Sequence, residues 1–219
     1  MMRSIKLFAL LLATALLATG CATQRTPYDY AEFKQARPAS ILVLPPLNSS
    51  PEVAATSGML SQVTYPLAES GYYVIPVTLA SETFKQNGLV TPADIHNVSP
   101  AKLREIFGAD AGLYVEVKAY GTSYQVISSS TVVTAEAKLL DLRSGKVLWQ
   151  GTATASSAEN QQNNNGLLGM LVSAVINQIA DTLSDASFKI AGMTSHRLLM
   201  AGRANGMLYG PRSPQYQKD

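Results

Sequence analysis

Cysteine, histidine and charge are all scarce in this chain of 219 residues. There is one cysteine, there are two histidines, and charged residues make up 15% of the sequence, against about a quarter in an ordinary soluble domain. A single cysteine excludes an internal disulfide and any zinc site built from several thiolates. Hydrophobic residues reach 47%, which is enough for a core and excludes a chain that is disordered throughout. The length suits one domain.

The small excess of positive charge belongs to the first few residues. The whole chain has 17 Lys and Arg against 15 Asp and Glu. Arg3 and Lys6 lie in a segment that we expect to be removed, and without them the two signs are equal in number. A neutral body without a basic cluster argues against nucleic acid as a partner and against electrostatic docking on anionic lipid.

The cysteine stands at the end of a signal-like segment, residues 1–20. A basic start is followed by an apolar run, Leu7–Leu17, whose length fits a signal peptide and is too short to span a bilayer. The stretch Leu17–Cys21 (LATGC) resembles a bacterial lipobox. We therefore predict cleavage before Cys21 and lipidation of its thiol, which also explains an unpaired cysteine in an exported protein.

The residue after the cysteine indicates the membrane to which the protein is sorted. Ala22, rather than Asp, resembles the signal that sends bacterial lipoproteins onward to the outer membrane. We predict a lipid-anchored outer-membrane protein whose body faces the periplasm, with exposure on the cell surface as the open alternative. Residues 21–38 then form the acylated N-terminus and a polar linker. Its aromatic side chains, which we expect to pack back on the domain rather than to contact a partner, are Tyr28, Tyr30 and Phe33.

The first half of the body alternates strand and helix patterns. The continuous apolar run Ser40–Leu44 is typical of a strand covered on both faces. A helical pattern follows from Glu52 to Ser70, with Val53 on its apolar face. Pro66 should kink or shorten that helix, and Gly71 should end it in the left-handed conformation.

A second strand and two more helices complete this half. Tyr72–Pro76 predicts the strand, and a short helix is expected from Leu79 to Gln86. Ser99 and Pro100 are typical of an N-cap and a first helical residue. Gly108 should close the helix that they begin.

The middle of the chain predicts an antiparallel meander. Leu113–Tyr120 and Val132–Leu140 alternate apolar and polar residues, and Val147–Ala155 returns after a tight hairpin. Gly145 supplies the positive φ that such a turn requires. Each of the three strands should have one solvated face, with Tyr120 on it.

The C-terminal part predicts two helices and a tail. A polar loop precedes a long apolar-faced helix, Leu167–Ser187, which we expect to cover the meander, and a weaker helix is expected over Ser195–Ala204. The predicted fold class is α/β, with a single mixed β-sheet of about five strands and helices packed on it. The domain is expected over residues 39–190, followed by a C-terminal helix and Pro/Gly-rich tail over residues 191–219.

Five segments of the chain carry a resemblance to known proteins: residues 42–50, 66–76, 107–110, 140–149 and 208–211. Together they resemble the bacterial lipoproteins grouped as domain of unknown function 799. The resemblance covers nearly the whole mature chain, and Arg212 and Ser213 depart from it where an aromatic residue and a histidine are expected.

This resemblance implies a periplasmic α/β domain like the amino-terminal domain of the Tol translocation protein and like the curli-secretion lipoprotein. Those relatives are assembly and partner-binding modules, not enzymes. The resemblance also implies a homodimer and envelope proteins as partners, but it supplies no established activity.

The residues themselves offer no catalytic constellation. Asp94 and His96 could supply two metal ligands, but no third is evident, so we predict no metal site and no cofactor. The G-x-S-x-G motif of a serine hydrolase is absent from the sequence. A pair of carboxylates, Asp94 with Glu105 or Asp110 with Glu116, could in principle hydrolyse a glycan, although caps and solvated charges are the favoured interpretation.

Tyrosines are the residues most typical of a binding surface, because each presents a large apolar area with a polar tip. The favoured function is a non-enzymatic outer-membrane lipoprotein that binds protein partners in the assembly or stabilisation of an envelope transport or secretion complex. The alternatives are a peptidoglycan-linked role, as hydrolase or as activator of a cell-wall synthase, and a lipid-binding or lipid-transport accessory. The candidate partner-binding residues are Tyr114, Tyr120, Tyr124, Tyr209 and Tyr216, with packing beneath helices as the alternative for the first two.

Overall fold

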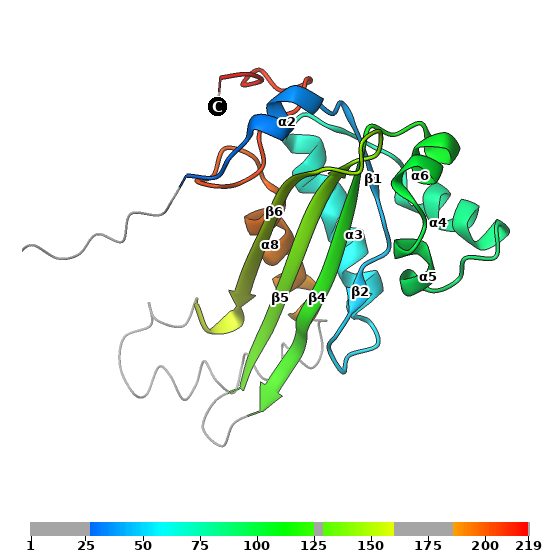
Figure 1. The fold of residues 1–219 in the computed structure, drawn as a ribbon. Coiled ribbons are helices and arrows are strands. Elements are labelled where there is room, and N and C mark those ends of the chain that lie inside the picture. Colours follow the sequence, from blue (N-terminus) through cyan, green and yellow to red (C-terminus); the bar gives the residue numbers. More distant parts are fainter. Residues whose placement is uncertain (1–26, 125–128, 160–185, 219) are drawn as a thin grey trace, which may run out of the picture.

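A computed structural model of the protein describes residues 27–124, 129–159 and 186–218. They form a single α/β domain on one mixed sheet, as predicted (Figure 1). The strands are β1 (Ser40–Val43), β2 (Leu47–Asn48), β3 (Tyr73–Val74), β4 (Ala111–Tyr124), β5 (Ser129–Asp141) and β6 (Val147–Ser156). Their order is β3-β1-β4-β5-β6, with β2 beside β4, so the sheet has six strands where the sequence predicted about five.

The sheet has a parallel half and an antiparallel half. β1 runs parallel to β3 and to β4, and β2 also runs parallel to β4. β4, β5 and β6 form the predicted antiparallel meander. Gly145, in the β5–β6 hairpin, has the expected positive φ of 73°.

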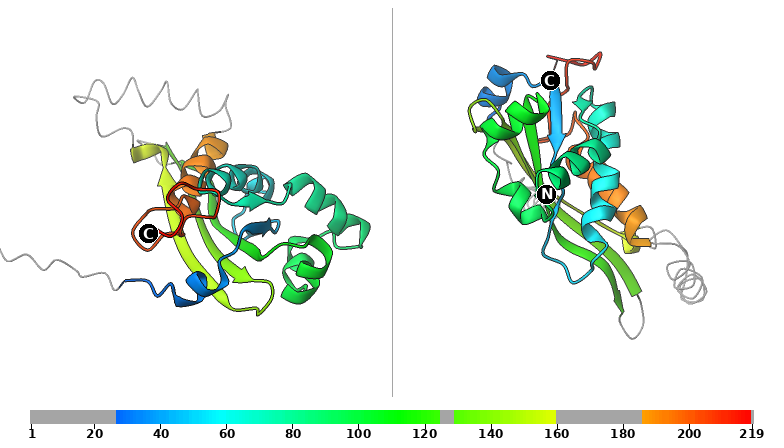
Figure 2. Two further views of the ribbon diagram at one scale, coloured as in Figure 1. Left: turned by 90° about the horizontal axis from the view of Figure 1, so that it is seen from above. Right: turned by 90° about the vertical axis from the view of Figure 1, so that its right-hand side faces the viewer.

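Helices cover the two faces of the sheet unequally (Figure 2). On one face, α3 and α8 pack over the meander and enclose the main core. On the other face, α4, α5 and α6 gather beside β1 and form a second, smaller core. The helices are α2 (Ala31–Ala36), α3 (Ala55–Glu69), α4 (Val77–Gln86), α5 (Pro92–His96), α6 (Pro100–Phe107) and α8 (Ala186–Leu199). None of the helices described is both long and apolar enough to cross a membrane.

The two cores explain the continuous apolar run of β1. Ile41 and Val43 point into the main core, whereas Leu42 and Leu44 belong to the second. All four side chains are buried. The predicted strand covered on both faces is confirmed.

The first long helix differs from its prediction at the start. It begins at Ala55, and Val53 is 90% exposed in the turn that precedes it, so Val53 does not belong to the apolar face. The helix continues past Pro66 to Glu69. Gly71 then has the expected left-handed φ of 94°.

A β-bulge in β4 overturns the predicted position of Tyr120. The register with β5 shifts between Val117 and Ala119, and an extra residue in a strand reverses which face the next side chains occupy. Tyr120 is therefore 5% exposed and lies in the main core, not on the solvated face. Its hydroxyl lies over Gly58 of α3, where a Cβ atom would have no room.

The expected linker and tail are part of the folded body. Phe33 of α2 is buried in the main core, and Tyr28 and Tyr30 pack against it, which confirms that the aromatic residues fold back. Tyr30 Oη donates to the carbonyl of Gly206 (2.5 Å), and the Tyr28 N–H donates to Asn205 Oδ1 (3.1 Å). We call these two paired segments, residues 28–37 and 201–213, the terminal clasp.

The tail half of the clasp lies against the end of α3 and β3. The Gly210 N–H donates to the carbonyl of Ser70 (2.8 Å), and the Arg212 N–H donates to that of Gly71 (3.0 Å). The Arg212 guanidinium stacks over the ring of Tyr73, 5.0 Å from its centre. The C-terminal segment thus lies beside the start of the edge strand β3, whose Tyr73 stays 43% exposed.

The last helix also differs from its prediction. Residues 160–185, which hold most of the predicted long helix, lie outside the described residues. α8 runs from Ala186 to Leu199, so the boundary expected between residues 190 and 191 falls inside a helix. Gly192 and Thr194 are poor helix formers, but Gly192 packs closely on Gln62 and the Thr194 hydroxyl donates to the carbonyl of Val133 (3.1 Å). Tertiary packing carries the helix through this stretch.

Candidate functional site

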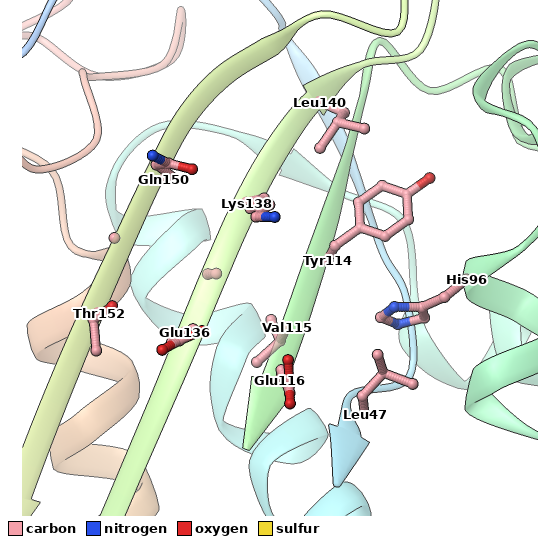
Figure 3. A pocket seen from close by; sticks show the side chains of 12 residues that line it. Leu47, His96, Tyr114, Val115, Glu116, Glu136, Lys138, Leu140, Gln150 and Thr152 are labelled. Carbon is pink, nitrogen blue, oxygen red and sulfur yellow. The ribbon is translucent and has the colours of Figure 1, made fainter. Parts of the chain in front are cut away.

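α3 and α8 pack on one face of the meander. In the view of Figure 1, no described helix lies in front of the middle of the other face, which bears the side chains drawn in Figure 3. Polar side chains from the three strands stand there in rows. Cross-strand pairing sets Tyr114, Lys138 and Gln150 in one row and Glu116, Glu136 and Thr152 in the next. A cavity of about 620 Å³ lies over these rows. We call it the sheet trough, lined by the two rows together with Leu47 and His96.

α5 and β2 form the side wall of the trough, through His96 and Leu47. α5 is capped by Thr91, whose hydroxyl oxygen accepts from the Asp94 N–H (3.2 Å), and the helix ends at His96. His96 Nε2 lies 2.9 Å from the carbonyl oxygen of Pro45. Because a carbonyl can only accept, Nε2 carries the proton. The imidazole meets the Tyr114 ring edge-on, with 5.2 Å between centres.

Burial lowers the pKa of His96 below its ordinary value of 6.5, although the bond to Pro45 and the charge of Glu116 act in the opposite direction. Burial also raises the pKa of the Tyr114 phenol. Both rings are therefore neutral at pH 7, and the wall of the trough carries no net charge of its own.

The row of Glu116, Glu136 and Thr152, which is the lower one in Figure 3, holds two carboxylates directly opposite each other. Glu116 pairs with Glu136 across β4 and β5, and like charges in that position are unfavourable alone. Lys118 lies between them, with its Nζ 2.7 Å from Glu116 and 3.5 Å from Glu136. Ser49 Oγ donates to Glu116 as well (2.6 Å). The bond from Lys118, followed by that from Ser49, holds the pKa of Glu116 below its ordinary value.

The row of Tyr114, Lys138 and Gln150, which is the upper one in Figure 3, holds a cation that is not shared between carboxylates. The side chain of Lys138 is exposed, and this side chain makes no ion pair or hydrogen bond with another described residue. Its cross-strand neighbours, Tyr114 and Gln150, are neutral. Within the described part of the trough, Lys138 is therefore the charge open to an anionic group on a ligand or partner.

The structure separates the five candidate tyrosines. Tyr114 lies half-buried in the sheet trough, and Tyr120 is in the core. Tyr124 ends β4, and its side chain lies outside the description. Tyr209 and Tyr216 line a different cavity, of about 190 Å³, between α2 and the C-terminal tail. A partner-binding role for Tyr114, Tyr209 and Tyr216 stays a prediction.

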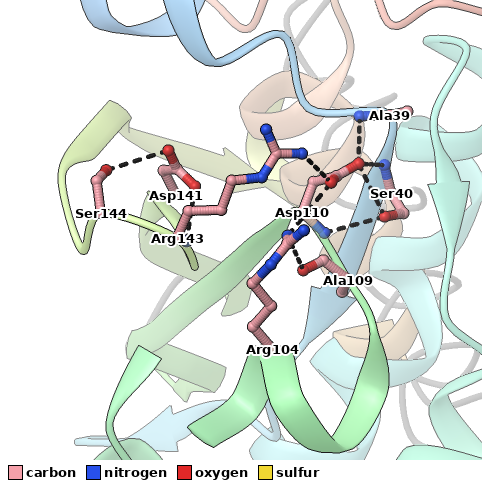
Figure 4. Close-up of polar contacts among 8 residues, drawn as sticks. All are labelled: Ala39, Ser40, Arg104, Ala109, Asp110, Asp141, Arg143 and Ser144. Atoms are coloured by element: carbon pink, nitrogen blue, oxygen red, sulfur yellow. Dashed lines mark hydrogen bonds and ion pairs between the residues drawn. The ribbon is translucent and has the colours of Figure 1, made fainter. Parts of the chain in front are cut away.

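The carboxylates considered for glycan hydrolysis have other partners. Asp110 is held by Ser40, Arg104 and Arg143 (Figure 4). It precedes Glu116 by six residues along an extended chain, a separation of roughly 20 Å, far more than the spacing of under about 10 Å that glycosidases use.

The other pair is no better suited. Asp94 accepts from the Thr91 hydroxyl, and Glu105 pairs with Lys102 on the surface. No group of three or more potential metal ligands gathers in the parts of the chain that the structure describes.

Neither the helix α5 nor the position of His96 in the trough wall was predicted from the sequence. The signal available was the Thr91–Pro92 start with Asp94 two positions later, an N-cap pattern that lacked a long apolar run. Lys138 falls within the predicted strand Val132–Leu140, but nothing in the sequence singled it out. Its open position depends on cross-strand neighbours that a single sequence does not reveal.

The sequence and the fold of this chain are similar to those of known proteins. The family model described as "Putative lipoprotein GNA1162-like" matches residues 28–212. The chain belongs to the GNA1162-like lipoprotein family. The match begins at Tyr28 and ends at Arg212, so it includes both halves of the terminal clasp apart from the last residue, Ser213.

A curated sequence and a solved structure from Neisseria meningitidis are both similar to this chain. "Putative lipoprotein NMB1124/NMB1162" of serogroup B strain MC58 is 50% identical over 207 residues, 94% of this chain and 96% of that protein. The crystal structure of lipoprotein GNA1162 is 58% identical, with a TM-score of 0.54, and covers 66% of this chain and 99% of its own. A dodecamer of PelC from Paraburkholderia phytofirmans is 16% identical over 79% of this chain and 91% of its own, with a TM-score of 0.46.

Membership of the GNA1162-like family identifies the chain as a bacterial envelope lipoprotein. Cys21 itself, like the rest of residues 1–26, lies outside the described residues. Its acylation, and the choice of the outer membrane, are therefore carried forward as proposals.

Proposed function

We propose that this protein is an outer-membrane lipoprotein, acylated at Cys21, that binds an envelope protein through the sheet trough. Its role is then non-enzymatic and lies in the assembly or stabilisation of a transport or secretion complex. The observation that carries this proposal is the trough itself, with Lys138 open between neutral neighbours and Glu116 and Glu136 beside it. Family membership supports the lipid anchor.

The charges of the trough favour a protein partner of defined chemistry. An acidic side chain of the partner would pair with Lys138, and amide or hydroxyl groups would bond with Gln150 and Thr152. The lower carboxylates already share Lys118, so they need no cation from the partner. Charge complementarity of this kind sets partner choice and association rate more than affinity.

The test is site-specific photocrosslinking in cells that express the full-length protein. A photoreactive amino acid at Gln150 should crosslink to one or a few envelope proteins. The matched control is the same amino acid at Gln86, an exposed position on α4, away from the trough. Equal products from both positions, or none from Gln150, would reject the trough as the binding surface.

Two substitutions separate the parts of the proposal. Lys138→Glu should reduce crosslinking from Gln150 while the protein stays in the membrane fraction, because it reverses the charge that recruits the partner. Cys21→Ser should abolish acylation of the chain. Detection of the acyl group on any residue other than Cys21 by mass spectrometry would contradict the assigned anchor.

The homodimer implied by the sequence resemblance is a further proposal. Sedimentation analysis of the detergent-solubilised, acylated protein would distinguish one copy from two. A monomer at all concentrations tested would reject it.

A further inference from the structure

The cavity inside the terminal clasp has the composition of an anion site. Its volume is about 190 Å³, and aromatic rings form much of its wall. Phe33 and Tyr209 come from the two halves of the clasp, Tyr72 precedes β3, and Tyr216 follows the second half of the clasp. Lys34 and Arg37, from the end of α2, supply two cations, and no Asp or Glu is among the residues that line it. We call it the clasp cavity.

Arg37 is fixed at the mouth of this cavity by its backbone. It ends α2 in the left-handed conformation, with φ of 44°, and its N–H donates to the carbonyl of Phe33 (3.0 Å). Its Nε donates to the carbonyl of Lys34 (3.1 Å). Among the described residues no other group bonds to this guanidinium, so its two terminal nitrogens remain for a ligand. Arginine presents such donors in a fork that matches a phosphate group.

The clasp cavity also lies close to the expected membrane anchor. The ring centres of Tyr28 and Tyr30 are 5.0 Å apart in a tilted contact, and those of Tyr30 and Phe33 are 6.4 Å apart in an edge-on contact, so a row of aromatic rings leads from the start of the body to the cavity wall. Cys21 precedes Tyr28 by seven residues, which span about 25 Å at most when fully extended. A body held by an acyl group on Cys21 therefore keeps this end near the lipid surface.

We propose that the clasp cavity binds the phosphate of a phospholipid headgroup in the membrane that holds Cys21, and this rests on the proposed acylation. Tyrosine side chains are enriched at the depth of the lipid headgroups in membrane proteins. The cavity is smaller than the roughly 300 Å³ and more that encloses a drug-sized ligand, which suits a single headgroup rather than an acyl chain. The neutral charge of the whole body does not oppose this, because the acyl chains supply the long-range localisation.

The experiment uses the acylated full-length protein in nanodiscs that contain a phospholipid with a photoreactive headgroup. Crosslinked peptides are mapped by mass spectrometry, and the Cys21 peptide is examined for its acyl group in the same digest. Headgroup crosslinks should fall within residues 31–38 and 208–217. Arg37→Gln should reduce them about fivefold, the contribution of one cation at a lipid surface.

Further variants and controls make the result decisive. Arg37→Lys keeps the charge and should retain most of the crosslinking, whereas Lys85→Gln, an exposed change on α4, should leave it unaltered. Inorganic phosphate added to the same nanodiscs should not compete. Thermal unfolding of each variant establishes that it is folded, and Tyr216→Phe provides a second, conservative probe of the cavity wall.

The possible results lead to different conclusions. Crosslinks that are unchanged in Arg37→Gln, or that map elsewhere, would overturn the headgroup site while leaving the lipid anchor and the sheet trough intact. Competition by inorganic phosphate would reassign the cavity to a soluble phosphate and overturn the lipid source. A Cys21 peptide without an acyl group would overturn the anchor, and with it this inference.

Discussion

At the scale of single residues, Asp110 joins three segments that are distant in sequence (Figure 4). Its Oδ2 accepts from the N–H groups of Ala39 (3.0 Å) and Ser40 (3.2 Å), and its Oδ1 accepts from Arg143 (2.6 Å) and Arg104 (3.4 Å). Burial raises the pKa of Asp110, but the bonds from Ala39, Arg143, Ser40 and Arg104 outweigh it and lower the pKa below 3.8. The ionised carboxylate therefore fixes the starts of β1 and β4 to the β5–β6 hairpin.

Asp110→Asn should lower the free energy of unfolding by about 2 kcal/mol, because charge-assisted hydrogen bonds are lost. A lowered pKa gives stability that is present above the unfolded pKa and lost as the pH falls through the folded one. Urea unfolding from about pH 7 down to about pH 3 should thus show a steeper loss for the native protein than for the variant. Glu105→Gln, which breaks an exposed pair with Lys102, is the control and should change stability by less than about 0.5 kcal/mol. Identical pH profiles for native protein and Asp110→Asn would contradict the assignment.

His96 offers a second test at this scale. Its pKa is lowered by burial, so the unfolded chain takes up a proton more readily, and stability should fall as the pH drops below 6.5. NMR titration of the imidazole should give a midpoint below 6.5. His96→Gln identifies the resonance and should remove this part of the pH dependence. A midpoint above the ordinary value would mean that the bond to Pro45 and the charge of Glu116 together outweigh burial.

At the scale of elements, the bulge in β4 couples the sheet to α3. Tyr120 turns into the core and lies over Gly58, where a Cβ atom would collide with its hydroxyl. Gly58→Ala should destabilise the protein by about 1–3 kcal/mol through overpacking, although alanine alone would favour a helix. In a Tyr120→Phe background the same change should cost less, and a double-mutant cycle of urea unfolding measures the difference. Strictly additive effects would show that the two residues are not in contact.

The elements also show what the sequence could and could not predict. Period-two alternation predicted β5 and the first part of β4, because residues such as Val115, Val133 and Leu139 all face one core. The same alternation failed at Tyr120, since a bulge adds a residue without a mark of its own in the pattern. Continuous hydrophobicity predicted the doubly covered β1 for the reason that the structure confirms.

The site was less predictable than the fold. Tyr114 was singled out as a binding residue and does lie in the sheet trough, but the open cation Lys138 and the wall residue His96 were not recognised as parts of one cavity. Their proximity is produced by strand register and by α5, and neither follows from local sequence. The pairing of residues 28–37 with the C-terminal tail in the terminal clasp was not predicted, for the same reason. The bonds of Tyr28 and Tyr30 join residues that are more than 170 positions apart.

At the scale of the whole molecule, the two ends of the described chain hold each other in place. Trp149 Nε1 donates to the carbonyl of Asn205 (3.1 Å), and Tyr72 Oη donates to that of Leu208 (2.6 Å). Deletion of residues 205–219 should therefore lower the melting temperature, loosen α2 and shift the fluorescence of the single tryptophan to longer wavelength. Deletion of residues 214–219 alone leaves the bonds of Gly210 and Arg212 and should have a smaller effect. Unchanged tryptophan emission after the longer deletion would contradict the clasp.

The terminal clasp also determines how the protein responds to mechanical load. If the lipid pulls on Cys21 while a partner holds the sheet trough, the force enters the body at Tyr28 and acts first on its bond to Asn205 and on that of Tyr30 to Gly206. Tyr28 precedes Tyr30 in the chain, so its bond carries the load first, and the buried residues Phe33 and Pro38 follow along the segment. Release of residues 28–38 would lengthen the tether from about 25 Å to about 60 Å while the sheet stays folded. The distance between membrane and partner is then set by tension as well as by chain length.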